Sequence, residues 1–86
     1  MSHGPAAYVR ANAPTFARYI ETLARRAHND AEIAVLTDLL RCSELGDDAA
    51  LIALMAQRFE SVCKAYYAAP NRNLKILVRI AGMEIR

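Results

Sequence analysis

Two cysteines and two histidines are the residues of this 86-residue chain best suited to bind a metal or to pair as nucleophile and base. His3, His28, Cys42 and Cys63 have none of the short, repeated spacings that structural zinc sites use. Neither histidine is spaced to serve a cysteine as a base. We therefore expect no metal site, no cofactor and no cysteine nucleophile, and we expect both thiols to act as small buried apolar groups.

The nine carboxylates offer acid–base chemistry in principle, but their positions favour a structural role. Nearly all of them fall at predicted helix starts or on polar helix faces, where they cap helices and aid solubility. Glu84 is the exception, because it falls on the apolar side of the last predicted helix. The chain also has no glycine-rich phosphate loop and no nucleophile and base at a motif spacing. We expect no catalytic residues and no enzymatic activity.

Basic residues near the C-terminus form the pattern that most favours a binding surface. Four of them fall within about 60° of one another on a helical wheel, and together they define a basic stripe. Such a stripe is either a solvated face, a surface for phosphates or a surface for an acidic protein. A looser basic patch at Arg18, Arg25 and Arg26 has the same alternatives. The residues of the basic stripe are Arg72, Lys75, Arg79 and Arg86.

Apolar residues in excess of what one small core can cover predict a contact between subunits. Hydrophobic residues make up 55% of the chain, which is high for its length. Tyr67 points sideways from its helix, and tyrosine is enriched at contact surfaces. With it, we expect three apolar residues of the last helix, Val78, Ile80 and Met83, at such an interface.

The elements that position these residues are all predicted to be helical. The length indicates one domain, and the alanine content favours helices. Short turns would make neighbouring helices antiparallel, so we expect a small bundle of about four antiparallel helices. The predicted helices span 13–28, 30–44, 47–68 and 72–85, after a flexible or short helical lead-in at 1–12.

Local signals set these boundaries. Pro14 suits a first helical turn, and Asn29 with Glu32 has the spacing of a capping box. Gly46 supplies a helix stop, after which Asp47 can cap the next helix. That next helix, 47–68, has the longest uninterrupted amphipathic pattern, so we expect it to be the spine of the domain, with 30–44 placed centrally.

The tail from 72 to 85 is the stretch in which helix and strand compete, because it is rich in strand-prone residues. A helix separates the charged and apolar residues, whereas a strand would place Lys75 and Arg79 on the same face as Leu77. We therefore predict a helix. A variant with three core helices, whose tail helix docks on a second subunit, stays open.

A helix-turn-helix is the sharpest alternative for the segment 31–68, but its residues do not suit DNA. Its second helix would enter the groove with Asp47 and Asp48, which repel phosphates, and without arginine, asparagine or glutamine at its start. We reject that function. Phosphate binding through the basic stripe remains as an alternative, in which the protein is a nucleic-acid-binding regulator.

The interpretation that the residues favour is a small, cytoplasmic, non-enzymatic interaction module that self-associates as a homodimer. It would act as an adaptor or regulator by binding another protein. The net charge of +2 is mild and its signs are interspersed, so charge alone does not predict nucleic acid. The sequence has no apolar run long enough for a membrane span, and we expect no membrane partner.

Overall fold

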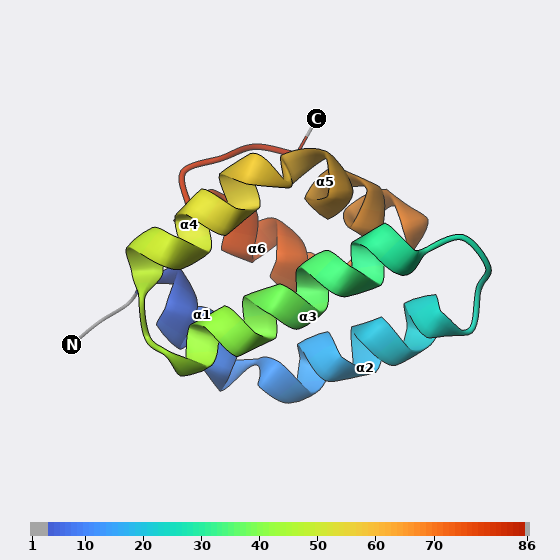
Figure 1. Cartoon of the computed structure of the whole chain (residues 1–86), viewed down its shortest axis with the longest axis horizontal. Helices are drawn as coiled ribbons and strands as arrows, with labels where there is room; N and C mark the ends of the chain where they lie inside the picture. The colour runs from blue at the N-terminus through green and yellow to red at the C-terminus, as the bar shows by residue number, and fades with distance from the viewer. Residues whose placement is uncertain (1–3, 86) are drawn as a thin grey trace.

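Helices make up most of the described part of the chain, residues 4–85 of a computed structural model (Figure 1). No strand occurs among these residues, which confirms the predicted all-α class. Six helices are found there, rather than about four. They are α1 (Pro5–Ala11), α2 (Ala13–Ala24), α3 (Asp30–Glu44), α4 (Asp48–Gln57), α5 (Phe59–Ala68) and α6 (Arg72–Ile80).

The central element is α3, which packs against α1, α2, α4 and α5 (Figure 1). Val35, Leu36 and Leu39 of α3 are almost completely buried. These residues lie within about 100° of one another around the helix axis, so one buried face of α3 contacts several neighbouring helices. The prediction that 30–44 lies centrally is therefore confirmed, whereas the choice of 47–68 as the spine is wrong.

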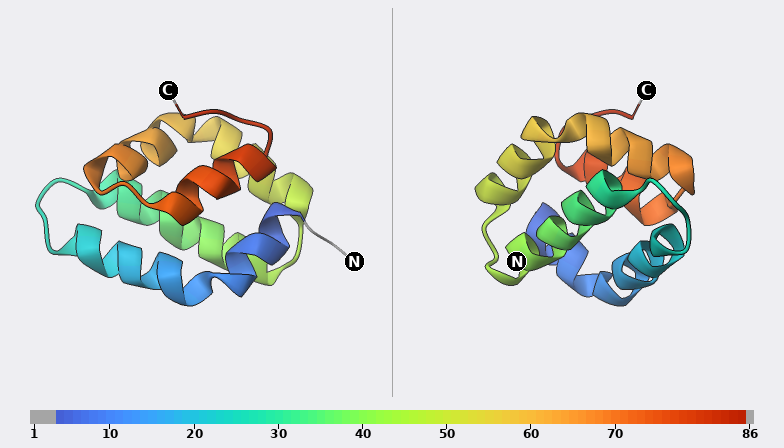
Figure 2. Two further views of the ribbon diagram at one scale, coloured as in Figure 1. Left: turned by 180° about the vertical axis from the view of Figure 1, so that it is seen from behind. Right: turned by 45° about the vertical axis from the view of Figure 1, so that its right-hand side comes forward.

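One hydrophobic core joins all six helices. The view from behind in Figure 2 shows α6 crossing the side of the molecule opposite to α3, between α2 and the pair α4 and α5. Helix α1 closes one end of this core and contacts α2, α3, α4 and α6. The largest fully buried side chains are Phe16, Leu23, Leu36, Leu39, Leu51, Met55, Leu74, Leu77, Val9, Val35, Val62 and Val78.

Three predicted local signals are found at helix boundaries of the structure. Gly46 has φ of +70°, the left-handed conformation that ends α3. The Asp47 side chain then accepts a 3.0 Å hydrogen bond from the Ala50 amide and caps α4. Pro14 lies in the first turn of α2, as expected for a residue without an amide hydrogen. These signals are local, so the sequence reveals them.

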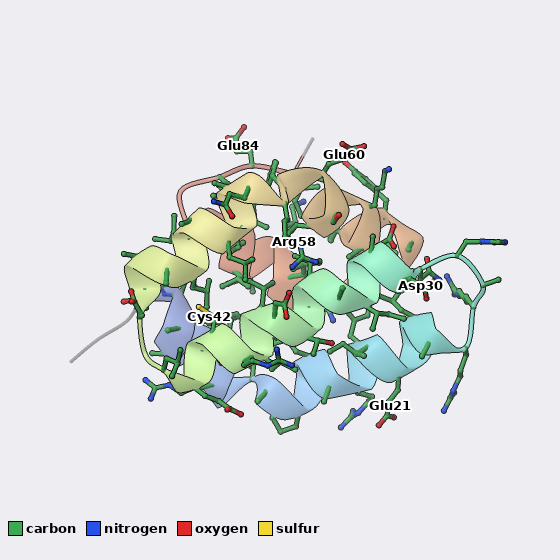
Figure 3. The ribbon with its side chains drawn as sticks, viewed as in Figure 1. Glu21, Asp30, Cys42, Arg58, Glu60 and Glu84 are labelled. Carbon is green, nitrogen blue, oxygen red and sulfur yellow. The ribbon has the colours of Figure 1, made fainter. Side chains whose placement is uncertain are left out.

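The predicted helix 47–68 is divided at Arg58, which has φ of −119° and ψ of 31° and separates α4 from α5. Neither glycine nor proline lies at this break. Figure 3 shows the Arg58 side chain extending from the break toward α3, where its guanidinium group forms an ion pair with Asp38. The break gives α4 and α5 different directions, so both can pack on α3.

The last helix is shorter than predicted, because α6 ends at Ile80 rather than at residue 85. Gly82 has φ of +80°, and its amide donates to the Arg79 carbonyl at 2.9 Å. The Met83 amide donates to the Val78 carbonyl, also at 2.9 Å. These two bonds form a Schellman motif, which ends a helix and turns the chain back along it.

The predicted helix 13–28 ends at Ala24, and the turn that follows differs from the expected capping box. His28 takes the left-handed conformation with φ of +69°. Asn29 lies at the N-cap position of α3, but its side chain caps no amide there. Instead, the Asn29 amide group donates a 3.2 Å hydrogen bond back to the Leu23 carbonyl. Asn29 therefore stabilises the end of α2 rather than the start of α3.

The predicted lead-in 1–12 contains α1, and residues 1–3 lie outside the described part. Polar side chains attach this short helix to the rest of the molecule. Asp48 Oδ1 on α4 accepts a 2.9 Å hydrogen bond from the Ala6 amide. At the other end of α1, Asn12 Oδ1 accepts a 3.0 Å hydrogen bond from Asn73 on α6. These bonds fix α1 between α4 and α6.

Candidate functional site

The basic stripe lies on α6, and three of its four predicted members fall within the described residues. Arg72, Lys75 and Arg79 are all exposed, and we call these three residues the basic face. Asn71 starts this helix, because its Oδ1 accepts from the Asn73 and Leu74 amides at 2.8 Å and 3.3 Å. Arg86, the fourth predicted member, lies outside the described part of the chain.

The opposite side of α6 holds the basic face in place. Leu74, Leu77 and Val78 are buried in the core with at most 1% of their surface exposed. The helix is therefore strongly amphipathic, with charges on one side and aliphatic side chains on the other. This pattern confirms the predicted helix over its first nine residues and orients all three cations of the basic face toward solvent.

Two open hollows flank the basic face. The larger one, about 320 Å³, is lined by Arg72, Lys75, Ile76 and Arg79. The second, about 200 Å³, lies where the chain turns back after α6. Lys75 and Arg79 line both hollows and separate them. The residues of the second hollow are Lys75, Val78, Arg79, Met83, Glu84 and Ile85.

The charges of the basic face have no acidic partner within the described residues. The ion pairs found there join Asp38 to Arg41 and Arg58, and Glu60 to Lys64. Three cations on neighbouring turns of one helix therefore face solvent outside any ion pair of the described residues, and the carboxylate that shares the site with them is Glu84, which lines the second hollow with Lys75 and Arg79. A surface of this kind attracts carboxylates and phosphates.

The aromatic residues near this face were missed by the sequence analysis. Lys75 Nζ lies 6.0 Å from the centroid of the Tyr66 ring, within the range of a cation–π contact. Tyr66 packs edge to face on Tyr67, with ring centroids 5.3 Å apart. Tyr66 and Lys75 lie on different helices, so no local spacing in the sequence could have revealed their contact.

The looser basic patch on α2 is not a second uniform surface. Arg18 and Arg25 are exposed, but Arg26 Nη1 donates a 2.6 Å hydrogen bond to the Ala68 carbonyl at the end of α5. Arg26 thereby satisfies a carbonyl that a helix end leaves unpaired. Its role in this structure is to join the end of α5 to the turn after α2.

The four residues expected at an interface are placed very differently. Tyr67 is 57% exposed and Ile80 is 37% exposed, so both are accessible. Met83 is half-buried beside α6. Val78 is 1% exposed and belongs to the core of its own chain, so we correct its assignment to an interface. In the amino-acid sequence, strand-prone Val78 resembles its exposed neighbour Ile80, and the difference emerges from the angle of each residue on α6.

The residues considered for chemistry do not converge. Cys42 and Cys63 are both half-buried and free of disulfide bonds. Burial and, secondarily, the charge of Asp47 raise the pKa of the Cys42 thiol above its ordinary value, which lowers the fraction of reactive thiolate. Within residues 4–85, no group of three or more metal-binding side chains comes together. Figure 3 shows Glu21, Asp30, Glu60 and Glu84 at separate places on the outside of the molecule.

Comparisons with known proteins leave the interpretation to the structure itself. No family model, curated protein or solved structure matches this chain. None of the described helices is long and apolar enough to cross a membrane.

Proposed function

We propose that this chain is a non-enzymatic interaction module that binds an acidic protein through the basic face of α6 and acts as an adaptor or regulator. One observation carries the proposal: Arg72, Lys75 and Arg79 lie exposed on neighbouring turns, without an acidic partner among the described residues, and line an open hollow. Charge complementarity of this kind steers association and selects the partner. The cytoplasmic location expected from the sequence stays a prediction.

Site-specific photo-crosslinking in cells tests the proposal for a partner of any identity. A photoreactive amino acid replaces Ile80, which is 37% exposed on α6, and in a second protein it replaces exposed Ala17 on α2. We expect a discrete protein adduct from position 80 and none of the same size from position 17. The same adduct from both positions, or none from position 80, would contradict the proposal.

A matched pair of charge variants makes the test specific. The first variant neutralises the basic face by Arg72→Gln, Lys75→Gln and Arg79→Gln. The control neutralises three exposed arginines elsewhere: Arg10, Arg18 and Arg25. Each variant loses three positive charges, so the formal net charge falls from +2 to −1 in both (2 − 3 = −1). We expect the adduct to disappear in the first variant and to persist in the control.

Nucleic acid is the second candidate, and the same exposed cations favour it. Three phosphate contacts would give a slope of about −2.7 in a plot of log affinity against log salt concentration. Binding to duplex DNA would then weaken about 40-fold between 50 and 200 mM salt. Fluorescence anisotropy with a labelled duplex measures this slope. A slope of that size, lost when the basic face is neutralised, would show that the partner is nucleic acid rather than a protein.

Self-association stays a separate proposal, and it rests on the exposed large apolar side chains. Leu45 is 81% exposed at the turn between α3 and α4, Tyr67 is 57% exposed on α5, and Ile80 is 37% exposed on α6. They come from three separate elements. Light scattering behind a sizing column tests self-association by measuring the molar mass at high micromolar concentration. A homodimer has twice the monomer mass, and a strict monomer would contradict the proposal.

A further inference from the structure

The shape of the basic face points to the kind of segment that binds there, and this inference rests on the function proposed above. Arg72, Lys75 and Arg79 are separated by three and then four residues. At a rise of 1.5 Å per residue, their backbone positions follow one another at about 4.5 Å and about 6 Å along the helix axis. A second helix that runs antiparallel to α6 meets these positions in reverse order. Its residues match the same distances when they are separated by four and then three residues.

The second hollow, which has both charged and apolar walls, lies beside Lys75 and Arg79. The Schellman motif at Gly82 turns the chain back, so that half-buried Met83 and Ile85 line this hollow together with Val78. Methionine adapts its shape to different apolar groups and is common at binding surfaces that accept them. The apolar wall formed by Met83 and Ile85 can therefore contact an aliphatic side chain, while the neighbouring cations of the basic face attract anions.

This combination separates a protein segment from a nucleic acid. Phosphates would use the three cations but leave the hollow at Met83 and Ile85 without an apolar occupant. An amphipathic helix supplies both chemistries from one face, because residues spaced by three and four lie on one stripe. Helix dipoles favour the antiparallel arrangement, in which each helix end lies beside an end of opposite partial charge.

We infer that the partner segment is an acidic amphipathic helix with the pattern Leu-x-x-x-Glu-x-x-x-Glu-x-x-Glu, bound antiparallel to α6. Its leucine occupies the hollow at Met83 and Ile85, and its three glutamates lie beside Arg79, Lys75 and Arg72. Calculated from the helix rise, the leucine lies about 6 Å before the first glutamate, beside the end of α6 where the chain turns back at Met83.

Glu84 provides an independent test of the sign of the partner's charge. It is exposed, lines the second hollow and projects away from the C-terminal segment (Figure 3). Its carboxylate repels the glutamates of an acidic helix across the edge of the site. The substitution Glu84→Gln removes this repulsion, so it is expected to strengthen binding about twofold, in line with the small energies of exposed charges.

Binding of a synthetic peptide tests the inference. The probe is a capped helical peptide with this pattern on an alanine and glutamine background, and the control has the same composition with its glutamates distributed around the helix. By fluorescence anisotropy, we expect the patterned peptide to bind the whole chain at least about fivefold more tightly than the control. Neutralising the basic face should weaken its binding about tenfold.

Three results would overturn the inference: equal binding of the two peptides, weaker binding after Glu84→Gln, or binding of duplex DNA without binding of the patterned peptide. Met83→Ser should weaken binding of the patterned peptide. It should not change the affinity for a variant peptide that lacks the leucine. The photo-crosslinking experiment is independent of these peptides. A protein adduct at position 80 combined with equal binding of the two peptides therefore refutes the acidic helix and keeps the proposed function.

Discussion

Lys75 Nζ on α6 lies 6.0 Å from the centroid of the Tyr66 ring on α5. This contact crosses the boundary between two helices and places the middle cation of the basic face beside an aromatic ring. Tyr66 itself rests against Tyr67, whose ring is inclined by 76°. The end of α5 therefore helps to position the charge that we assign to partner binding, although neither tyrosine belongs to the basic face.

Replacing Tyr66 tests whether this ring positions Lys75. Tyr66→Phe keeps the aromatic face and should leave binding of the patterned peptide unchanged. Tyr66→Leu removes the ring, and the loss of about 0.5 kcal/mol for an exposed cation–π contact predicts about twofold weaker binding. Anisotropy titrations of both variants measure the difference. Equal affinities for Phe and Leu would show that the contact has no role in binding.

Asp48 and Gly4 are expected to be energetically coupled. Asp48 Oδ1 on α4 accepts a 2.9 Å hydrogen bond from the Ala6 amide and so caps α1 from another helix. A Cβ atom at position 4 would lie 2.0 Å from Asp48 Oδ2, so Gly4→Ala must displace this carboxylate. Each single substitution, Gly4→Ala or Asp48→Ala, should cost about 1 kcal/mol through loss of the cap.

A double-mutant cycle in urea measures this coupling. Once Asp48 is alanine, Gly4→Ala has no carboxylate to displace and should cost little further stability. Additive costs in the double variant would contradict the arrangement. Gly46→Ala is a useful contrast, because φ of +70° makes it unfavourable although no atom lies within 4 Å of the added Cβ.

Tyr19 should make stability depend on pH in the alkaline range. Its hydroxyl is buried and donates to the Ala65 carbonyl, and burial raises the pKa of Tyr19 to about 12. The folded state therefore holds this proton more strongly than the unfolded state, whose pKa is about 10. The resulting stability is complete below pH 10 and is lost as the pH rises from about 10 to about 12.

The variant Tyr19→Phe isolates this effect. At neutral pH its free energy of unfolding should be about 1 kcal/mol lower than that of the wild-type chain, because the hydrogen bond to Ala65 is removed. Between pH 10 and pH 12 the free energy of unfolding of the wild-type chain should fall by about 2 to 3 kcal/mol relative to that of the variant. Urea unfolding of both proteins across this range measures the difference. A constant difference at all pH values would exclude a titrating Tyr19.

The basic face should depend on the cap that starts α6. Asn71→Ala removes the acceptor for the Asn73 and Leu74 amides and should cost about 1 kcal/mol. Hydrogen exchange should accelerate at Asn73 and Leu74 more than at the amides of α3. Asn71→Asp retains the acceptor and should restore protection. Acceleration spread evenly over the chain would contradict a local role for this cap.

Residues close in sequence account for the parts of the fold that could be predicted. The stop at Gly46 and the cap at Asp47 depend on atoms within one helical turn, so the amino-acid sequence shows them directly. The end of α6 belongs to the same class, since Gly82 carries a comparable signal that the apolar pattern of 72–85 obscured. The amphipathic pattern also located the basic face correctly, because it depends on angles around one helix.

Contacts between distant segments account for what could not be predicted. The break at Arg58 has no local marker and coincides with an ion pair to Asp38, on another helix. Asn29 has the spacing of a capping residue, yet its side chain donates to Leu23. The approach of Tyr66 to Lys75 likewise depends on how α5 and α6 pack. No spacing within one helix contains that information.

Amide chemical shifts of the ¹⁵N-labelled chain, titrated with the patterned acidic peptide, test most directly whether α6 forms the binding site. If the basic face of α6 is the binding site, shifts will be confined to α6, to residues 83–85 and to the neighbouring end of α5. The control peptide should cause smaller shifts at the same amides. Shifts centred on α2 or α4, or no shift on α6 at saturating peptide, would contradict the claim.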